Sequence, residues 1–145
     1  MRFMRLGLLT AMAMTAAATA SAQQGNTISA PIQGLRNNVG EVRCGLFNSD
    51  ATFRKPGQQM MGVAVPIVNQ QATCVFNNVP PGTYAIAAFH AEKNETQLQT
   101  NFLGIPKEGY GFSRNPSTTF GPPGFSDAAY AYPGGATSWP ITITY

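Results

Sequence analysis

His90 is the residue whose side chain is best suited to chemistry, because it is the only histidine in the chain. An imidazole changes its charge near neutral pH and can act as an acid or a base. Glu92 and Glu108 are the carboxylates that could act with it. The alternative is a histidine at the end of a strand that hydrogen-bonds the following loop and holds its first turn. We favour this structural role, so the sequence predicts no catalytic residue.

The serines and glycines of the C-terminal half do not form a catalytic or phosphate-binding motif. Ser113 and Ser117 lack the Gly-x-Ser-x-Gly context of an activated nucleophile. Gly104, Gly109 and Gly111 lie close together, but no predicted strand and helix flank them with the spacing of a phosphate loop. We expect these glycines to provide positive φ angles and close backbone packing. The chain is therefore better explained as a binding or structural protein than as an enzyme.

Cys44 and Cys74 are the only cysteines, and we predict that they form a disulfide. Each lies in a segment of alternating apolar residues, on the face expected to point to the core. A disulfide persists in the oxidising compartment that an exported chain enters. Two buried free thiols are the alternative. A zinc site is not expected, because these residues and one histidine cannot supply the four ligands of structural zinc.

Short alternating segments separated by turn signals predict an all-β domain. The strand expected at 83–90 is apolar on both faces, which predicts a central position in its sheet. Pro31, in a first strand at 27–35, suits an edge position because it cannot donate to a ladder. The other expected strands are 41–47, 61–67, 72–76, 125–132 and 138–145, with 61–67 and 72–76 forming a hairpin. About seven short strands indicate a single antiparallel β-sandwich.

The segment from Ala91 to Gly124 contains no predicted strand or helix, which makes it a long loop for so small a domain. Its aromatic residues argue against disorder, and we expect an ordered lid that packs on one end of the sandwich. The rings of Tyr110, Phe112, Phe120 and Trp139 either form an exposed platform for a ligand or fill the end of the sandwich. The residues that we expect to contact a ligand are His90, Lys107, Glu108, Tyr110 and Phe112.

Residues 1–22 have the features of a signal peptide. Two arginines precede an apolar stretch, and Ala20-Ser21-Ala22 fits a signal peptidase site. The apolar stretch is too short to cross a bilayer of about 30 Å as a helix, and no later stretch is a candidate transmembrane segment. We therefore expect a mature domain of residues 23–145, which is periplasmic or secreted after cleavage near Ala22.

The charge of the chain does not indicate a nucleic-acid partner. The formal net charge is +3, and two of the positive charges, Arg2 and Arg5, would leave with the signal peptide. The remaining lysines and arginines are not clustered, so a basic interaction patch is not expected. A glycan, a peptide or another component of the cell envelope remains as the expected class of partner.

Three runs of sequence resemble the domain of unknown function 2141 family, and the resemblance covers nearly the whole mature chain. The runs are Val42-Arg43-Cys44-Gly45-Leu46-Phe47-Asn48, Val79-Pro80-Pro81-Gly82-Thr83-Tyr84 and Phe102-Leu103-Gly104-Ile105-Pro106-Lys107-Glu108-Gly109-Tyr110-Gly111-Phe112-Ser113. The last run is the most specific, whereas many transthyretin-like and immunoglobulin-like sandwiches enter a strand through a Pro-Gly-x-Tyr element. The resemblance implies an extracytoplasmic β-sandwich of this kind and brings no established activity.

Members of this family usually carry an acidic, calcium-like pattern after the histidine that corresponds to His90. The matching positions here are Ala91, Lys93, Glu95, Thr96 and Gln99. Calcium requires about six to eight oxygen ligands, with carboxylates prominent among them. The sequence lacks both aspartates of the pattern and the glycine of its turn, and a lysine occupies one ligand position. We therefore expect neither calcium nor another cofactor.

These observations predict an exported, non-catalytic binding or envelope-associated module whose ligand-facing end is the 91–124 segment. Two alternatives remain open. One is a periplasmic enzyme that uses His90 as an acid or base. The other is a structural envelope protein that associates through an edge strand, for which the first strand is the candidate.

Overall fold

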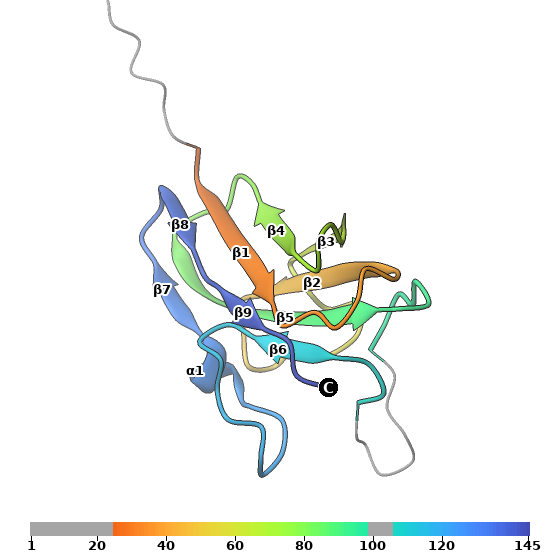
Figure 1. Cartoon of the computed structure of the whole chain (residues 1–145). Coiled ribbons are helices and arrows are strands. Elements are labelled where there is room, and N and C mark those ends of the chain that lie inside the picture. Colours follow the sequence, from red (N-terminus) through yellow and green to blue (C-terminus); the bar gives the residue numbers. More distant parts are fainter. Residues whose placement is uncertain (1–24, 99–105) are drawn as a thin grey trace, which may run out of the picture.

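The computed structural model describes residues 25–98 and 106–145, which form a β-sandwich of two sheets (Figure 1). The predicted signal peptide, residues 1–22, lies outside the described residues. In chain order the strands are β1 (Thr27–Gln33), β2 (Glu41–Phe47), β3 (Met61–Pro66), β4 (Ala72–Phe76), β5 (Gly82–Ala91), β6 (Tyr110–Phe112), β7 (Tyr130–Tyr132), β8 (Ala136–Ser138) and β9 (Ile141–Thr142). A short helix, α1 (Phe125–Ala128), precedes β7. The prediction of a β-sandwich is confirmed.

The two sheets differ in size and in strand direction. The four-stranded sheet has the order β4-β1-β8, with β9 also paired to β1, and the five-stranded sheet has the order β3-β2-β5-β6, with β7 also paired to β5. The pairs of β1 with β8 and β9 are parallel, because the C-terminal chain runs alongside β1 in the same direction. The other pairs are antiparallel. The parallel pairs of β1 are thus the exception in a sandwich that otherwise follows the antiparallel prediction.

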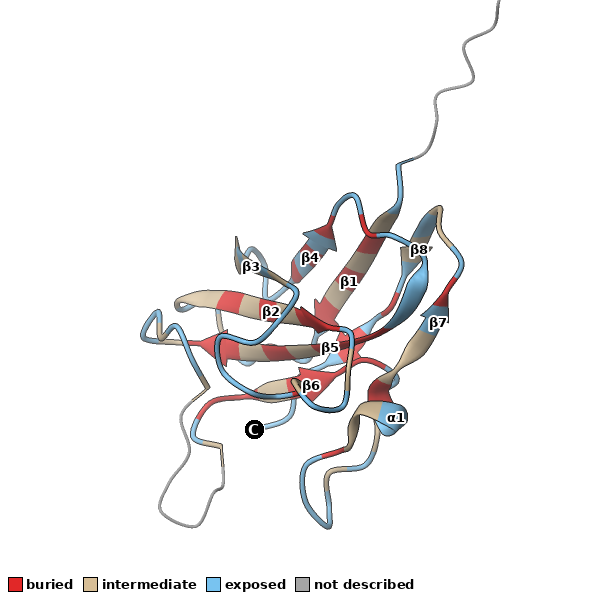
Figure 2. Ribbon diagram, turned by 180° about the vertical axis from the view of Figure 1, so that it is seen from behind, coloured by how far each residue is buried: buried red, intermediate tan, exposed pale blue. Residues whose placement is uncertain are grey.

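Alternation along the strands places the main core between the sheets (Figure 2). In β2, Val42, Cys44 and Leu46 are at most 3% exposed, whereas the residues between them are only partly buried. Burial of one large aliphatic side chain stabilises the fold by about 1.5–3 kcal/mol. In β5 both faces are covered: Ile86 belongs to the main core and Ala85 to a second apolar cluster. This confirms that the strand is central in its sheet, between β2 and β6.

A disulfide between Cys44 and Cys74 joins the two sheets across this core. Cys44 lies in β2 and Cys74 in β4, and the Cα atoms of the two residues are 6.4 Å apart. The predicted disulfide is confirmed. It provides a covalent crosslink between the two sheets, in addition to the apolar contacts of the main core.

β1 is a central strand, which contradicts the expectation that Pro31 marks an edge. β4 pairs with β1 on one side, and β8 and β9 pair with it on the other. The carbonyls of Ser29 and Gln33 accept hydrogen bonds from the backbone N–H groups of Trp139 and Ile143. Pro31 lies between these two bonds and has no N–H to donate. The missing hydrogen bond falls at the interruption between β8 and β9, so no continuous strand pairing is lost. Association of an envelope protein through a free β1 edge is excluded by this pairing.

β3 and β4 pair with different sheets, so the expected hairpin is wrong. β3 pairs with β2 and β4 with β1. The chain crosses between the sheets at a tight turn, which an isolated bridge between Val68 and Gln71 closes. Asn69 and Gln70 adopt positive φ angles of 53° and 57° within it. The alternating sequence pattern does not distinguish a hairpin within one sheet from two strands in different sheets, because each strand buries one apolar face in both arrangements.

The C-terminal segments are shorter and more broken than the sequence predicts. The expected strand 125–132 divides into α1 and β7, and the expected strand 138–145 reduces to β8 and β9 with Pro140 between them. The Asp127 carboxylate accepts a hydrogen bond from the Gly124 N–H at 2.9 Å, which caps the first turn of α1. A helical turn here agrees with the preference of Asp for the first turn of a helix.

The 91–124 segment contains a strand, which corrects the expectation of a loop without secondary structure. β6 pairs with β5 and extends the five-stranded sheet. Residues 99–105, including Gly104, lie outside the described residues. Gly109 and Gly111 do not adopt the positive φ angles that we expected. Close packing is confirmed for both: a Cβ atom at Gly111 would lie 2.5 Å from the Thr142 carbonyl oxygen.

Candidate functional site

The outer face of the five-stranded sheet, which is turned away from the main core, carries a row of residues with little or no side chain. Strand pairing places Gly45 of β2 opposite Gly62 of β3 on one side and opposite Ala87 of β5 on the other. Phe112 of β6 lies opposite Ala87 and ends the row. The row therefore forms a shallow track across three strands, with an aromatic ring at one end.

The next row on the same face consists of larger side chains. Arg43 lies opposite Ala64 in β3 and opposite Phe89 in β5, and Tyr110 of β6 lies opposite Phe89. Because these residues are two positions away from the small ones along each strand, they share the same face. Their side chains form a wall beside the track.

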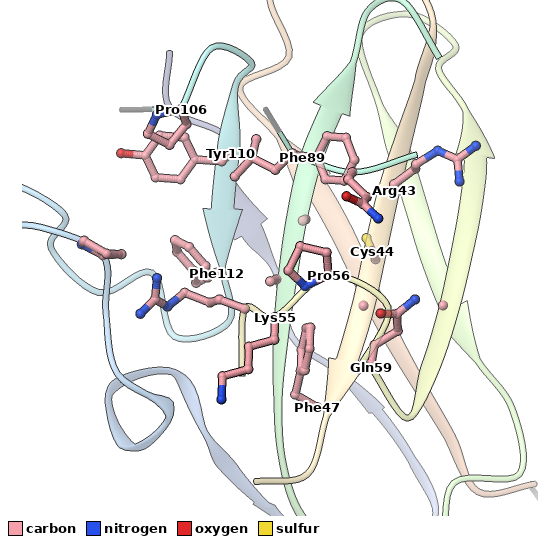
Figure 3. A pocket seen from close by; sticks show the side chains of 18 of the residues that line it. Arg43, Cys44, Phe47, Lys55, Pro56, Gln59, Phe89, Pro106, Tyr110 and Phe112 are labelled. Carbon is pink, nitrogen blue, oxygen red and sulfur yellow. The ribbon is translucent and has the colours of Figure 1, made fainter. Parts of the chain in front are cut away.

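Together with two loops, these rows enclose a groove of about 990 Å3, which we call the outer-face groove (Figure 3). One loop supplies residues 54–57 and Gln59, and the other supplies residues of the 91–124 segment. In Figure 3, Pro56 projects over the sheet between Phe112 and Cys44. The volume is at the upper end of the range of about 300–1,000 Å3 that is typical of small-molecule sites.

Aromatic rings make one end of the outer-face groove rigid and apolar. Phe53 packs edge-to-face against Phe47, Phe112 and Phe125, with ring centroids 5.5, 6.0 and 5.8 Å apart. The rings of Tyr110 and Phe112 are 5.9 Å apart. Such edge-to-face pairs stabilise by about 0.5–1.5 kcal/mol beyond the area that they bury. This second cluster holds the loop at residue 53 against the outer face and so fixes one wall of the groove.

The charged residues among the described residues that line the groove are Arg43, Arg54 and Lys55, and none is acidic. Arg43 is paired with Glu41 at 2.6 Å, and its Nε atom is buried without a hydrogen-bond partner. In the described part of the chain, Arg54 and Lys55 form no ion pair. The Arg54 guanidinium lies 5.9 Å from the centroid of the Phe53 ring. The groove thus has a net positive charge.

Gln59 is the polar side chain nearest to the track of small residues. Its atoms lie 3.3 Å from the position that a Cβ atom would take at Gly45 and also at Gly62. An amide at this place can donate and accept hydrogen bonds. It adds one adaptable polar group to a floor that is otherwise apolar.

The structure brings together two of the five residues that we expected to contact a ligand. Tyr110 and Phe112 line the outer-face groove. Lys107 is exposed and Glu108 is buried, and neither lines the groove. His90 lies in β5 with its ring fully buried. Of the two alternatives for the four rings, the exposed platform is not formed, because Trp139 stacks on Tyr130 in the main core, with centroids 4.7 Å apart.

His90 is held on both ring nitrogens by the protein itself. Its Nε2 atom is 2.6 Å from the Val39 carbonyl oxygen, which can only accept, so Nε2 carries the hydrogen and donates it. Its Nδ1 atom is 2.6 Å from the Tyr145 hydroxyl and forms a hydrogen bond with it. The same hydroxyl accepts a hydrogen bond of 3.1 Å from the Arg36 N–H. The imidazole therefore links the loop before β2 to Tyr145.

Charged groups surround this link at the surface. The Arg36 guanidinium lies 4.5 Å from the centroid of the Tyr145 ring and forms an ion pair with Glu92. Burial alone would raise the pKa of Glu92, but hydrogen bonds from Asn37 and Arg36 outweigh it and lower the pKa below 4.5. Burial raises the pKa of the Tyr145 hydroxyl above its usual 10.0, so this group keeps its proton near neutral pH. The arrangement stabilises the C-terminus and gives the imidazole no free nitrogen for chemistry.

The positions that match the calcium-like pattern do not gather carboxylates in the described residues. Glu92 is engaged by Arg36 and Asn37, and the Glu95 carboxylate accepts a hydrogen bond from the Lys93 N–H at 3.1 Å. Within residues 25–98 and 106–145, no three His, Cys, Asp or Glu side chains are placed to share a metal ion. The absence of a cofactor stays a prediction.

Ser113 has a structural role. Its side chain is fully buried, and its hydroxyl oxygen accepts a hydrogen bond of 2.8 Å from the Ile86 N–H. The same hydroxyl donates to the Ala128 carbonyl. It thereby fastens α1 and β6 to β5 and is not exposed as a nucleophile.

Sequence reasoning missed most residues of the groove, namely Arg43, Gly45, Gly62, Ala87, Arg54 and Lys55. One signal was present: Gly45 and Gly62 lie inside predicted strands, where glycine is unfavourable unless a bulge or a close approach requires it. Their direct opposition depends on the register of β2 and β3, which the sequence pattern does not reveal.

Comparison with known proteins gives a family and no function. A family model described as an uncharacterised protein conserved in bacteria (DUF2141) matches residues 31–139. No curated protein and no solved structure matches the chain. In the described residues, no helix is long and apolar enough to cross a membrane.

Proposed function

The chain belongs to the DUF2141 family of uncharacterised bacterial proteins, and we propose that it is an exported, non-catalytic binding protein whose ligand site is the outer-face groove. The ligand is a small molecule with a substantial apolar part. A disulfide that forms in an oxidising compartment, together with the predicted signal peptide, supports export. No observation favours a second function.

The observation that carries this proposal is the pair of opposed glycines on the floor of the groove. A glycine inside a strand is destabilising by about 0.5–1 kcal/mol relative to alanine. Gly45 and Gly62 are extended and do not need positive φ angles, so turn formation does not explain them. Side chains of the groove pack closely over both: a Cβ atom at Gly45 would lie 3.0 Å from the Phe47 ring and 3.3 Å from Gln59, and one at Gly62 would lie 3.3 Å from Gln59. Glycine at such a place permits close approach to the backbone, here by Phe47 and Gln59, and a ligand reaches the floor of the groove where the mobile end of Gln59 moves aside.

The aromatic walls suit an apolar ligand. Phe89, Tyr110 and Phe112 line the groove on the β5–β6 side, and Phe47 and Pro56 line it elsewhere. In Figure 3 Phe89 and Tyr110 lie along the same side of the groove, with Pro56 and Phe47 across from them. Sites of this kind gain most of their affinity from apolar contact and their orientation from a few polar groups. Gln59 and the cationic side chains supply the polar groups here.

Substitution of Gly62 by leucine tests the site. The new side chain would fill the floor of the groove, and its Cβ atom would meet only the flexible end of Gln59 at 3.3 Å. We expect Gly62→Leu to fold, because leucine suits an extended strand better than glycine. Binding of the neutral fluorescent dye Nile red, followed by its emission in apolar surroundings, should weaken at least about tenfold, since the ligand loses much of its contact area.

Thr73→Leu is the matched control, because Thr73 is an exposed strand residue of the other sheet and does not line the groove. It adds an apolar side chain of the same kind and should leave dye binding unchanged. Equal binding by Gly62→Leu and the wild-type protein would show that the dye binds elsewhere. Absence of saturable dye binding to the wild-type protein would overturn the proposal.

A further inference from the structure

We propose that the ligand of the outer-face groove is an anionic amphiphile, whose carboxylate is held by Arg54 and Lys55 at the Phe112 end and whose apolar chain lies along the glycine-alanine track. This inference rests on the proposed function and specifies its ligand. It is carried by the distribution of charge around the groove.

The positive charge of the groove is concentrated on two residues. Arg43 already has a carboxylate partner, because Glu41 lies 2.6 Å from it. Arg54 and Lys55 have no ion-pair partner in the described part of the chain. Two neighbouring cations without an acidic partner raise the local concentration of anions and favour them over cations. The electrostatic preference is therefore for a ligand with one negative end.

The two cations lie next to the aromatic end of the track. The Arg54 guanidinium is close to the Phe53 ring, and that ring packs against Phe112 at 6.0 Å. Figure 3 shows Lys55 directed away from Phe112 and from the centre of the groove, while Pro56 covers the sheet above it in this view. A chain that lies on the track can thus place its apolar part under Pro56 and its charged end at the cations, near solvent.

Hydroxyl groups complete this end of the groove. Thr118 and Thr119 line it on the side of the 91–124 segment. The Thr119 hydroxyl accepts a hydrogen bond of 3.1 Å from Ser117 and keeps its own hydrogen for a further acceptor. A carboxylate has several acceptor sites and can take one hydrogen bond from a guanidinium and others from hydroxyls. A neutral alcohol at the same place would gain much less from the two cations.

A pair of ligands with the same chain tests the inference. Decanoate and decanol, each below its solubility limit, would be titrated against Nile red bound to the full mature protein at neutral pH and low salt. We expect decanoate to displace the dye at a concentration at least about tenfold lower than decanol, as charge-assisted hydrogen bonds are roughly twice as strong as neutral ones. The ratio should decrease as salt is added, because both cations are exposed.

Removal of the charges should abolish the preference for the carboxylate. In Arg54→Gln/Lys55→Gln the decanoate-to-decanol ratio, measured against the dye affinity of that variant, should fall to about twofold or less. Lys93→Gln is the control for Lys55→Gln, because Lys93 is exposed and does not line the groove. It should keep the full ratio.

The outcomes separate the two proposals. If the wild-type protein binds Nile red but decanol and decanoate displace it equally, the groove is a binding site and the anionic end group is wrong. The same conclusion follows if the double variant keeps the preference for decanoate. If Nile red does not bind at all, the proposed function fails and the inference fails with it.

Discussion

Replacement of both Cys44 and Cys74 by alanine is expected to lower the free energy of unfolding by about 3–4 kcal/mol. The disulfide closes a loop with a sequence separation of 30 residues, and in the chain-entropy model a crosslink of this span restricts the unfolded chain by that amount. Its position adds to the effect, because it connects β2 of one sheet to β4 of the other. Both residues are at most 3% exposed, so the alanine side chains would also leave a small gap in the core.

Urea unfolding, followed by tryptophan fluorescence, measures this loss. Trp139 is the only tryptophan and is 6% exposed in the main core, so its emission reports on the packing of the sheets. Reduction of the wild-type protein is the control and should produce most of the same decrease without changing any side chain. A decrease below about 1 kcal/mol in both experiments would show that the crosslink does not constrain the unfolded state as the loop length predicts.

Substitution of His90 by leucine is expected to cost about 2–4 kcal/mol of stability. The leucine would fill a similar volume but would remove both hydrogen bonds of the imidazole, to the Val39 carbonyl and to the Tyr145 hydroxyl. An unsatisfied buried polar group costs about 1–3 kcal/mol. The contact between Tyr145 and the loop before β2 would loosen as well, since Arg36 also binds the Tyr145 hydroxyl.

Tyr145→Phe is the companion variant. It removes only the hydroxyl and keeps the ring over which Arg36 lies, so its cost should be nearer to 1 kcal/mol, about that of one hydrogen bond. The two costs should not add in the double variant, because both residues act through one hydrogen bond. A His90→Leu protein as stable as the wild type would contradict the structural role. It would instead support the alternative that His90 is an acid-base catalyst, which predicts a variant that is stable and inactive.

The fold could be predicted from the faces of the strands, but the order of the strands could not. Residues 83–90 are apolar on both faces, and this pattern requires a cover on each side of the sheet. β5 indeed contributes to two apolar clusters. By contrast, Pro31 indicated an edge, whereas the chain places it in the gap between β8 and β9. Periodicity reports which face is buried, and it carries no information about which strand lies alongside.

The site was harder to predict than the fold, because it is produced by register. Tyr110 and Phe112 could be identified from their type and their place in an aromatic-rich segment. Gly45, Gly62 and Ala87 are 17 and 25 positions apart along the chain and come together only through pairing. The cations of the loop at 54–55 reach the same groove because Phe53 inserts among aromatic rings of the outer face. Long-range contacts of this kind leave no local pattern.

His90 shows how a residue suited to chemistry can be a structural residue. Its type and its uniqueness made it the first candidate for catalysis, and the resemblance to the family directed attention to the loop after it. The structure encloses the ring completely and occupies both nitrogens. Burial of the side chain decides between a catalytic and a structural histidine. At the end of a strand, this burial depends on the tertiary contact with Tyr145, which the local sequence does not reveal.

The most direct test of the outer-face groove as a binding site is to map the ligand on the protein by the backbone amide signals in nuclear magnetic resonance. Titration of the isotope-labelled mature protein with decanoate should shift the signals of Gly45, Gly62, Ala87 and Phe112, which line the groove. Signals of Ser29 and Thr73 in the other sheet should stay in place. Shifts confined to the other sheet, or none with saturating ligand, would contradict the assignment of the site.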